Sequence, residues 1–223
     1  MCLFVLLGFG GFLKCAERDV EEIFTNIYDR QYWGSIETVS GWGSRLFATA
    51  NIRSSIPALI KKYNIKTLLD IPCGDFNWMK EVDLGVSLYI GADIVKKMIN
   101  INNEHYGSKD RIFMALDATV DDLPQVDMIF CRDCLIHLTF KEIHRVIQNF
   151  KKSGAKYLLV SNGLKVKINI DLEGLQRYRP INLLLFPFNF PRPKEILMEN
   201  DSSYTNKHVG RCLMLWKLDD INI

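Results

Sequence analysis

The chain has 223 residues, of which 48% are hydrophobic and 24% are charged, a composition typical of one globular α/β domain. Its net charge of +2 argues against a protein dedicated to long nucleic acids, so no such partner is expected. The six cysteines are scattered, which argues against a secreted disulfide framework and favours reduced thiols in the cytoplasm.

Residues 1–17 form an apolar N-terminal tail, and the single folded domain is expected to cover residues 18–223. The apolar run from Cys2 to Leu13 is too short to span a bilayer as a helix, and it lacks the basic stretch of a signal peptide. A tail or a start site set too far upstream is the favoured interpretation. Membrane contact through residues 1–13, or export, is the minor alternative.

Residues 18–50 predict a helix followed by a Gly/Ser-rich loop, and we expect this segment to form a lid. A second helix is predicted over 51–64. From there, mostly apolar strands alternate with helices, which predicts a parallel sheet covered on both faces. The strands are expected at 66–70, 87–93, 111–117, 126–133 and 156–162, with helices over 94–107 and 139–154.

The helix over 139–154 carries the clearest pattern in the chain. Thr139 and Glu142 have the spacing of a capping box, and an apolar stripe predicts the buried face. The stripe consists of Ile143, Val146, Ile147 and Phe150.

After residue 163 a Pro-rich, aromatic loop leads to two apolar runs at 195–200 and 212–218, which predict a closing antiparallel pair. The predicted fold is therefore a doubly wound, Rossmann-like α/β fold. Its sheet is mostly parallel, with helices on both faces and an antiparallel strand pair at the C-terminal end.

Three successive predicted strands end on an aspartate, at Asp70, Asp93 and Asp117. A single aspartate there is an ordinary turn or N-cap residue. Three together, at the edge where open parallel sheets bind ligands, favour a binding site.

The loop after the first of these strands departs from the dinucleotide fingerprint. Asp93 follows Asp70 by 23 residues, close to the ~20-residue offset of a ribose-binding acid. However, the loop holds one glycine, Gly74, and a further carboxylate, Asp75, which would repel a pyrophosphate. The pattern suits a cationic nucleoside such as S-adenosylmethionine and disfavours an NAD-dependent dehydrogenase.

Several motifs resemble those of the class I S-adenosylmethionine-dependent methyltransferases: LDIPCGDFNWM, YIGADIV, LDAT, VDMIFCRDCLIHLTF and KYLLVSN. More narrowly, the chain resembles a small, uncharacterised subgroup with the PCGDFNWM and CRDCL.HL motifs. The resemblance extends from about Phe24 to Leu218.

The resemblance implies a set of cofactor-binding residues. Asp70 and Gly74 would hold the methionine end of the cofactor, Asp93 the ribose, and Asp117 with the Ala118 backbone the adenine. Pro72 and Phe76 replace the outer glycines of the usual loop. Cys73, Asp75 and Trp78 are expected to complete the cofactor site in this altered loop.

The resemblance also places Arg132 and Asp133, at the end of the fourth strand, where substrate and methyl group meet. His137 follows Asp133 by four residues, so a helical segment would put them on one face, with Asp133 orienting His137 as a general base. A packing histidine is an equal alternative. Arg132 would position an anionic acceptor group.

Two further segments are candidates for the site. Trp33 or Trp42 in the lid would cover the sulfonium by a cation–π contact, and packing of an N-terminal arm is the alternative. The late loop over 177–193 forms either an acceptor pocket or a rigid cover, and its candidate residues are Arg177, Arg179, Phe188, Asn189 and Phe190. Cys131 and Cys134 are expected to be buried thiols, and no metal is expected.

The predicted function is methyl transfer from S-adenosylmethionine to a small or medium-sized acceptor, with a hydroxyl group as one candidate. Two alternatives stay open: a nucleic-acid or protein methyltransferase, and a non-catalytic protein that binds S-adenosylmethionine. The low net charge and the absence of an NPPY-type motif argue against the first.

Overall fold

The computed structural model describes residues 19–174, 177–199 and 208–223. The predictions for the apolar tail at 1–17, including membrane contact, lie outside these residues. Within the described ranges, no helix combines the length and the apolar character needed to cross a bilayer.

A seven-stranded sheet forms the centre of the fold, in the order β3-β2-β1-β4-β5-β7-β6. β1 to β5 are parallel, whereas β7 runs antiparallel to both β5 and β6. The predicted fold class is thereby confirmed. The strands are β1 (Thr67–Asp70), β2 (Leu88–Asp93), β3 (Arg111–Ala115), β4 (Met128–Cys131), β5 (Tyr157–Gly163), β6 (Glu195–Met198) and β7 (Arg211–Lys217).

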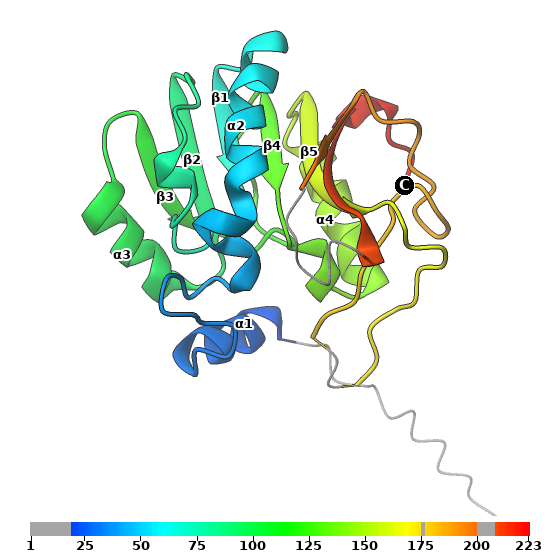
Figure 1. Cartoon of the computed structure of the whole chain (residues 1–223), viewed down its shortest axis with the longest axis horizontal. Coiled ribbons are helices and arrows are strands. Elements are labelled where there is room, and N and C mark those ends of the chain that lie inside the picture. Colours follow the sequence, from blue (N-terminus) through cyan, green and yellow to red (C-terminus); the bar gives the residue numbers. More distant parts are fainter. Residues whose placement is uncertain (1–18, 175–176, 200–207) are drawn as a thin grey trace, which may run out of the picture.

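Two helices cover opposite faces of this sheet, α2 on one and α4 on the other, as Figure 1 shows. The α-helices are α1 (Val20–Asp29), α2 (Leu46–Lys62), α3 (Lys96–Tyr106) and α4 (Phe140–Lys152). Four single 3-10 turns are η1 (Trp42–Ser44), η2 (Met79–Glu81), η3 (Leu135–His137) and η4 (Leu218–Asp220).

The strands alternate between the two faces with the period of two that a β-strand imposes. In β4, Met128 and Phe130 pack into the cluster on the α2 side, and Ile129 and Cys131 into the cluster on the α4 side. Because both faces are covered, all four side chains are at most 2% exposed.

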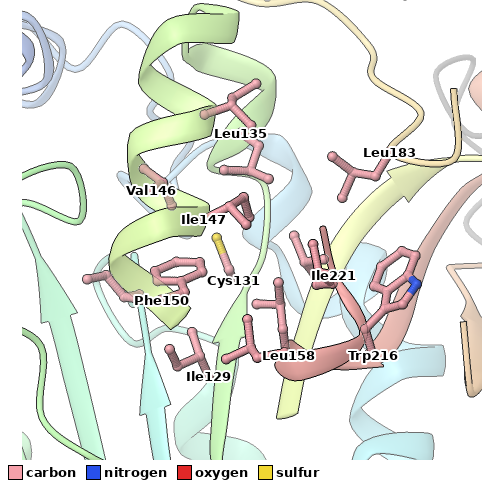
Figure 2. Packing of buried hydrophobic residues seen from close by; sticks show 14 of the residues in the cluster. Ile129, Cys131, Leu135, Val146, Ile147, Phe150, Leu158, Leu183, Trp216 and Ile221 are labelled. Atoms are coloured by element: carbon pink, nitrogen blue, oxygen red, sulfur yellow. The ribbon is translucent and has the colours of Figure 1, made fainter. Parts of the chain in front are cut away.

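The apolar stripe predicted for α4 forms the centre of the larger cluster. Thr139 and Glu142 make the capping box in both directions, so α4 begins where the sequence predicts. In Figure 2 the α4 side chains point at β4, β5 and β7. Each fully buried aliphatic side chain contributes roughly 1.5–3 kcal/mol of apolar transfer free energy. The labelled residues are Ile129, Cys131, Leu135, Val146, Ile147, Phe150, Leu158, Leu183, Trp216 and Ile221.

The third strand is shorter than predicted and ends at Ala115 instead of Asp117. Asp117 lies in a turn, where its Oδ1 atom accepts hydrogen bonds from the backbone N–H and the hydroxyl of Thr119, both at 2.7 Å. A side chain that bonds the backbone two residues on stabilises a turn rather than a strand.

The topology places a binding site at the carboxyl ends of the strands. The chain goes from β1 to β2 and β3 on one side of β1, and β4 and β5 lie on the other. In open sheets of this kind ligands bind outside the carboxyl ends, at the switch point between the two halves. α1 lies beyond this edge of the sheet, apart from both helical layers (Figure 1).

Candidate functional site

A cavity of about 450 Å³ lies at the carboxyl ends of the strands, under α1 and the segment that follows it. It contains every predicted cofactor-binding and catalytic residue except Asp75, whereas the further candidates Trp42, Arg179 and Phe188 lie outside its lining. The predicted residues in its lining are Trp33, Asp70, Cys73, Gly74, Trp78, Asp93, Asp117, Ala118, Arg132, Asp133 and His137.

Gly74 and Asp93 are held together at one end of the cavity. The backbone N–H groups of Gly74 and Val95 donate to the two carboxylate oxygens of Asp93, at 3.2 and 3.0 Å. Gly74 has a positive φ of 59°, and a Cβ there would lie 2.5 Å from the hydroxyl oxygen of Ser40. Only glycine fits this close approach without displacing its neighbours.

Asp70 and Asp93 are buried at this end, and neither carboxyl group makes an ion pair with a lysine or arginine among the described residues. Burial raises the pKa of Asp70 to about 8, although the Tyr89 hydroxyl donates to its Oδ2 atom at 2.5 Å. Burial likewise raises the pKa of Asp93 to about 6, against the backbone N–H groups that stabilise its charge. A cation placed beside them would favour ionisation of both groups.

Asp117 and Ala118 lie on the β3 side of the cavity, in the turn described above. The Ala118 carbonyl accepts a hydrogen bond from the Asn149 side chain of α4 at 3.0 Å, which fixes this turn against the helix. The structure therefore brings all three predicted strand-end acids to one cavity.

The β1–β3 half of the cavity suits a cation and not a phosphate. Among the lining residues numbered 70–119 there are three carboxylates and no lysine or arginine. A diphosphate there would meet only like charge, whereas an ammonium or sulfonium group would gain a carboxylate partner. These residues therefore fit S-adenosylmethionine better than a dinucleotide.

Cys73 and Trp78 line the cavity as buried side chains. The Asn102 amide contacts the Cys73 sulfur at 3.9 Å, and Trp78 packs edge-on against Phe130 with ring centroids 6.0 Å apart. Cys131 lies in the apolar core next to α4 (Figure 2). Within the described residues, no group of three or more His, Cys, Asp or Glu side chains is arranged to hold a metal ion.

Asp75 does not lie in the cavity lining, which corrects its prediction as a cofactor-binding residue. Its carboxylate accepts hydrogen bonds from the Thr38 and Ser40 hydroxyls at 2.7–2.9 Å and from the Val39 N–H at 2.9 Å. Asp75 thus fastens residues 38–40 to the cofactor loop. The loop's second carboxylate is explained by this contact with the N-terminal segment.

Arg132 and Asp133 belong to a cluster of four charges, two of them buried and two half-buried. Arg132 makes a two-pronged ion pair with Glu199, at 2.7 and 3.2 Å. Asp133 pairs with Arg211 at 2.6 Å, and Glu199 also lies 3.1 Å from Arg211. We call these four residues the ion cluster.

The ion cluster changes the roles predicted for two of its members. The Arg132 guanidinium also donates to the Gly43 carbonyl at 2.9 Å and stands 5.6 Å from the Trp78 ring, so it is engaged by the protein instead of awaiting an anionic acceptor. Burial opposes ionisation of Asp133, but Arg132 and Arg211 lower its pKa to about 2. Asp133 is therefore a permanent carboxylate and a poor proton acceptor.

The Asp133–His137 segment is not helical, so the predicted shared helix face does not exist. Asp133 has a positive φ of 53°, and only Leu135–His137 form a single 3-10 turn. The Nδ1 atom of His137 bonds the carbonyl of Arg177 instead. Because a carbonyl only accepts, Nδ1 carries the proton, and Nε2 holds the lone pair.

The electrostatic environment keeps His137 neutral. Burial lowers the pKa of His137 below its ordinary value, against the raising effects of the Arg177 carbonyl and the Asp133 charge. A neutral imidazole with its lone pair on Nε2 is the form that accepts a proton. His137 therefore has the chemistry of a general base, oriented by Arg177 and not by Asp133.

Trp33 contacts His137 directly. The two rings stack with centroids 4.4 Å apart and planes at 26°. Trp33 therefore covers the cavity on the side of the β4 end, where His137 lies. Trp42, in contrast, is 64% exposed and lies outside the lining.

The late loop has two parts with different surroundings. Tyr178 and Ile181 line the cavity, whereas the predicted residues Arg179, Phe188 and Phe190 pack into the fold as a cover. Arg179 donates to the carbonyls of Leu135 and Leu138 at 2.7 and 2.6 Å, and Phe188 and Phe190 are buried in the core. None of these three late-loop side chains lines the cavity.

Many residues of the cavity were not predicted from the sequence, and Tyr178, Glu199 and Arg211 are three that bear on its chemistry. Glu199 had a usable signal, because a carboxylate directly after the apolar run Ile196–Met198 must either reach solvent or find a buried partner. Its partner, Arg132, is 67 residues away in the chain. Spacing alone does not pair residues at such a distance.

Comparisons with known proteins bear on the fold. No protein-family model matches the sequence, and no curated protein matches it. Among solved structures, N-methyltransferase NodS from Bradyrhizobium japonicum WM9 with S-adenosyl-L-homocysteine has a TM-score of 0.62 at 12% identity, covering 86% of this chain and 98% of that one. The fold is that of S-adenosylmethionine-dependent methyltransferases.

Two further methyltransferases show the same likeness. The Burkholderia thailandensis 1,6-didemethyltoxoflavin-N1-methyltransferase has a TM-score of 0.61 at 13% identity, over 88% of this chain and 86% of that one. Magnesium protoporphyrin IX methyltransferase from Synechocystis PCC 6803, with bound S-adenosylmethionine, has a TM-score of 0.56 at 16% identity, over 90% and 97%. The methyltransferase fold thus accounts for nearly the whole described chain.

Proposed function

We propose that this protein is an enzyme that transfers a methyl group from S-adenosylmethionine to a small-molecule acceptor. The observation that carries the proposal is the β1–β3 half of the cavity, where Asp70, Asp93 and Asp117 meet and the lining residues numbered 70–119 include no lysine or arginine. The methyltransferase fold supports it, since solved structures with this fold hold S-adenosylmethionine or S-adenosylhomocysteine. Several of them are named for small-molecule substrates.

In this proposal each acid has a separate role. Asp93, fixed by two backbone N–H groups, accepts hydrogen bonds from the ribose hydroxyls. Asp70 takes the ammonium group, with the Gly74 backbone close to the methionine end. Asp117 and the Ala118 backbone are assigned to the adenine. When bound, S-adenosylmethionine supplies a methyl group on a positively charged sulfur, which takes back the bonding electron pair on transfer.

His137 is proposed as the general base, and this favours a hydroxyl acceptor. A hydroxyl oxygen must lose its proton as it gains a methyl group, and the Nε2 lone pair of a neutral His137 takes that proton. Asp133, with its pKa of about 2, stabilises the imidazolium ion that forms. Trp33 and α1 cover the cavity and limit the acceptor to a small or medium-sized molecule.

A cytoplasmic location is part of the proposal. The four described cysteines, Cys73, Cys131, Cys134 and Cys212, are all unpaired thiols. Reduced thiols are maintained in the cytosol.

The test is a methyl-transfer assay with full-length protein, methyl-labelled S-adenosylmethionine and a pool of small hydroxylated compounds. Label is expected in a small-molecule product, as a base-stable methyl ether. His137→Asn should lower kcat by about 10²–10⁴-fold, the usual contribution of a general base. Its affinity for S-adenosylhomocysteine should stay within about twofold, because His137 lies away from the cofactor half.

The matched control is His105→Asn, which changes an exposed histidine of α3 outside the cavity and should keep full activity. Label transferred only to protein or nucleic acid would contradict the small-molecule proposal. Cofactor binding without transfer to any of the three acceptor classes would indicate a non-catalytic binding protein.

A further inference from the structure

The half of the cavity over β4, β5 and β7 is separate from the proposed cofactor half. Ser161 and Asn162 at the end of β5 and Arg211 at the start of β7 form its floor. Tyr178 and Ile181 of the segment after β5 form one wall. Under the proposed function, this half receives the acceptor.

Four aromatic rings gather on one side of this half, and we call them the aromatic cluster. Trp33 stacks on His137 at 4.4 Å, and Phe24 packs edge-on against Trp33 at 5.8 Å. Tyr178 lies 6.0 Å from His137, with the two ring planes at 54°. All four rings line the cavity, and they come from α1, the segment after α1, η3 and the segment after β5.

The polar groups of this half carry no net charge. The ion cluster contains two arginines and two carboxylates, paired at 2.6–3.2 Å. An acceptor carboxylate reaching Arg211 would approach the carboxylates of Asp133 and Glu199 as well. An acceptor ammonium would meet Arg132 and Arg211 in the same way. Both ionised classes are therefore disfavoured against a neutral molecule.

One proton acceptor belongs to the aromatic cluster itself. Since Nδ1 of His137 is committed to the Arg177 carbonyl, Nε2 is the ring atom available to a ligand. His137, Trp33 and Tyr178 line the same half of the cavity, so a ligand ring bound there lies in the same cluster as a group that accepts a proton.

We infer that the acceptor is a neutral, planar aromatic molecule with a ring hydroxyl group, that is, a phenol. The inference rests on the proposed function and names the substrate class of the same site. The phenol oxygen forms the new bond to the methyl carbon, and the phenol proton passes to Nε2 of His137. The positive charge that leaves the methyl donor is matched by the imidazolium ion, so charge and protons balance.

The test measures binding by calorimetry, with the full chain saturated with S-adenosylhomocysteine. Three probes of similar size are compared: 2-naphthol, the saturated alcohol decahydro-2-naphthol, and the anionic 6-hydroxy-2-naphthoate. 2-Naphthol should bind at least about tenfold more tightly than either of the others, as expected for a ring packed against aromatic side chains. Equal affinity for the three probes, or tighter binding of the anion, would overturn the inference.

Variants locate the preference in the aromatic cluster. Trp33→Leu and Tyr178→Leu should each reduce the preference for 2-naphthol several-fold while leaving the affinity for S-adenosylhomocysteine unchanged, which also reports correct folding. Tyr178→Phe should keep the preference. The matched control is Trp42→Leu, because Trp42 is exposed and does not line the cavity.

The remaining outcomes are equally decisive. A preference that survives both leucine substitutions would overturn the role of the aromatic cluster. Binding of S-adenosylhomocysteine without any preference for 2-naphthol would overturn this inference alone. Failure of the unmodified protein to bind S-adenosylhomocysteine would overturn the proposed function, and the inference with it.

Discussion

The charge state of Asp70 depends on whether a cation is present at the site. With a pKa of about 8, this buried carboxyl group is largely protonated at neutral pH in the ligand-free protein. Tyr89, Asp93 and Arg132 act on it, and burial dominates. A ligand ammonium group would release its proton, so binding of the cofactor should become tighter as the pH rises towards 8.

The same group makes a prediction for stability. The folded pKa of Asp70 lies above the unfolded value of about 3.9, so the folded state holds a proton that the unfolded chain loses between pH 4 and pH 8. The stabilisation that Asp70 gives the folded state is complete below about pH 4 and disappears as the pH rises to about 8. Asp70→Asn removes this titration. Between pH 4.5 and pH 8, the free energy of unfolding of Asp70→Asn should therefore increase relative to that of the unmodified protein by about 1 kcal/mol or more.

Urea unfolding of the two proteins at pH 4.5, 6 and 8 measures this difference. Asp93, whose pKa is about 6, remains in both proteins, so only its interaction with Asp70 differs between them. If the free energies of unfolding of the two proteins changed with pH in the same way, Asp70 would be ionised in the folded protein, which contradicts this prediction.

The position of a site residue was predictable where it depended only on the end of a predicted strand. Asp70 and Asp93 end parallel neighbours in the sheet, so alternation and topology bring them to one edge. The Asp133–His137 pair failed because it assumed a helix, whereas Asp133 adopts a left-handed conformation that spacing does not reveal. His137 is oriented by Arg177, and no local pattern indicates that contact.

At the scale of elements, the N-terminal segment and the cofactor loop form one hydrogen-bonded unit. Beside the Asp75 contacts, the Asn77 side chain donates to Glu37 at 2.9 Å and to the Ser44 carbonyl at 3.2 Å. Gly74, with no side chain, allows Ser40 to approach the loop. The predicted lid is thereby attached to the loop that we assign to the cofactor.

Asp75→Ala tests this attachment. Removing the carboxylate leaves the Thr38 and Ser40 hydroxyls and the Val39 N–H without their shared acceptor. The free energy of unfolding should fall by about 1–3 kcal/mol, the usual cost of unsatisfied buried polar groups. Residues 30–44 should also become sensitive to limited proteolysis.

Asp83→Ala is the matched control, since Asp83 follows the same loop, is exposed, and accepts a bond from the Gly85 N–H at 3.2 Å. Unchanged stability and protease resistance in Asp75→Ala would show that the segment is held by α1 packing instead.

Helices and strands were predictable from the sequence wherever the hydrophobic period and the capping residues indicated the same element. The α4 stripe and its capping box are both present, because a strong 3.6-residue period and a local cap require no distant partner. Strand ends were less predictable. Asp117 falls two residues beyond β3, because its side chain stabilises a turn.

At the scale of the whole molecule, the strand order separates the proposed cofactor half from the proposed acceptor half along the carboxyl edge of the sheet. β1, β2 and β3 bring acids to one half of the cavity, while β4, β5 and β7 bring the ion cluster and His137 to the other. The ion cluster joins the end of β4, the end of β6 and the start of β7, and through Gly43 it also contacts η1. These elements are far apart in sequence, so the cluster was visible only in the folded chain.

The central claim is that the acidic half of the cavity binds a cationic nucleoside. Calorimetric titration with S-adenosylmethionine, S-adenosylhomocysteine and NADH tests it most directly, on the unmodified protein, Asp93→Ala and the exposed control Asp122→Ala. We expect micromolar or tighter binding of the first two ligands, a loss of at least about tenfold in Asp93→Ala, no loss in Asp122→Ala, and no binding of NADH. Binding of NADH, or no binding of either sulfur-containing ligand by folded protein, would contradict the account.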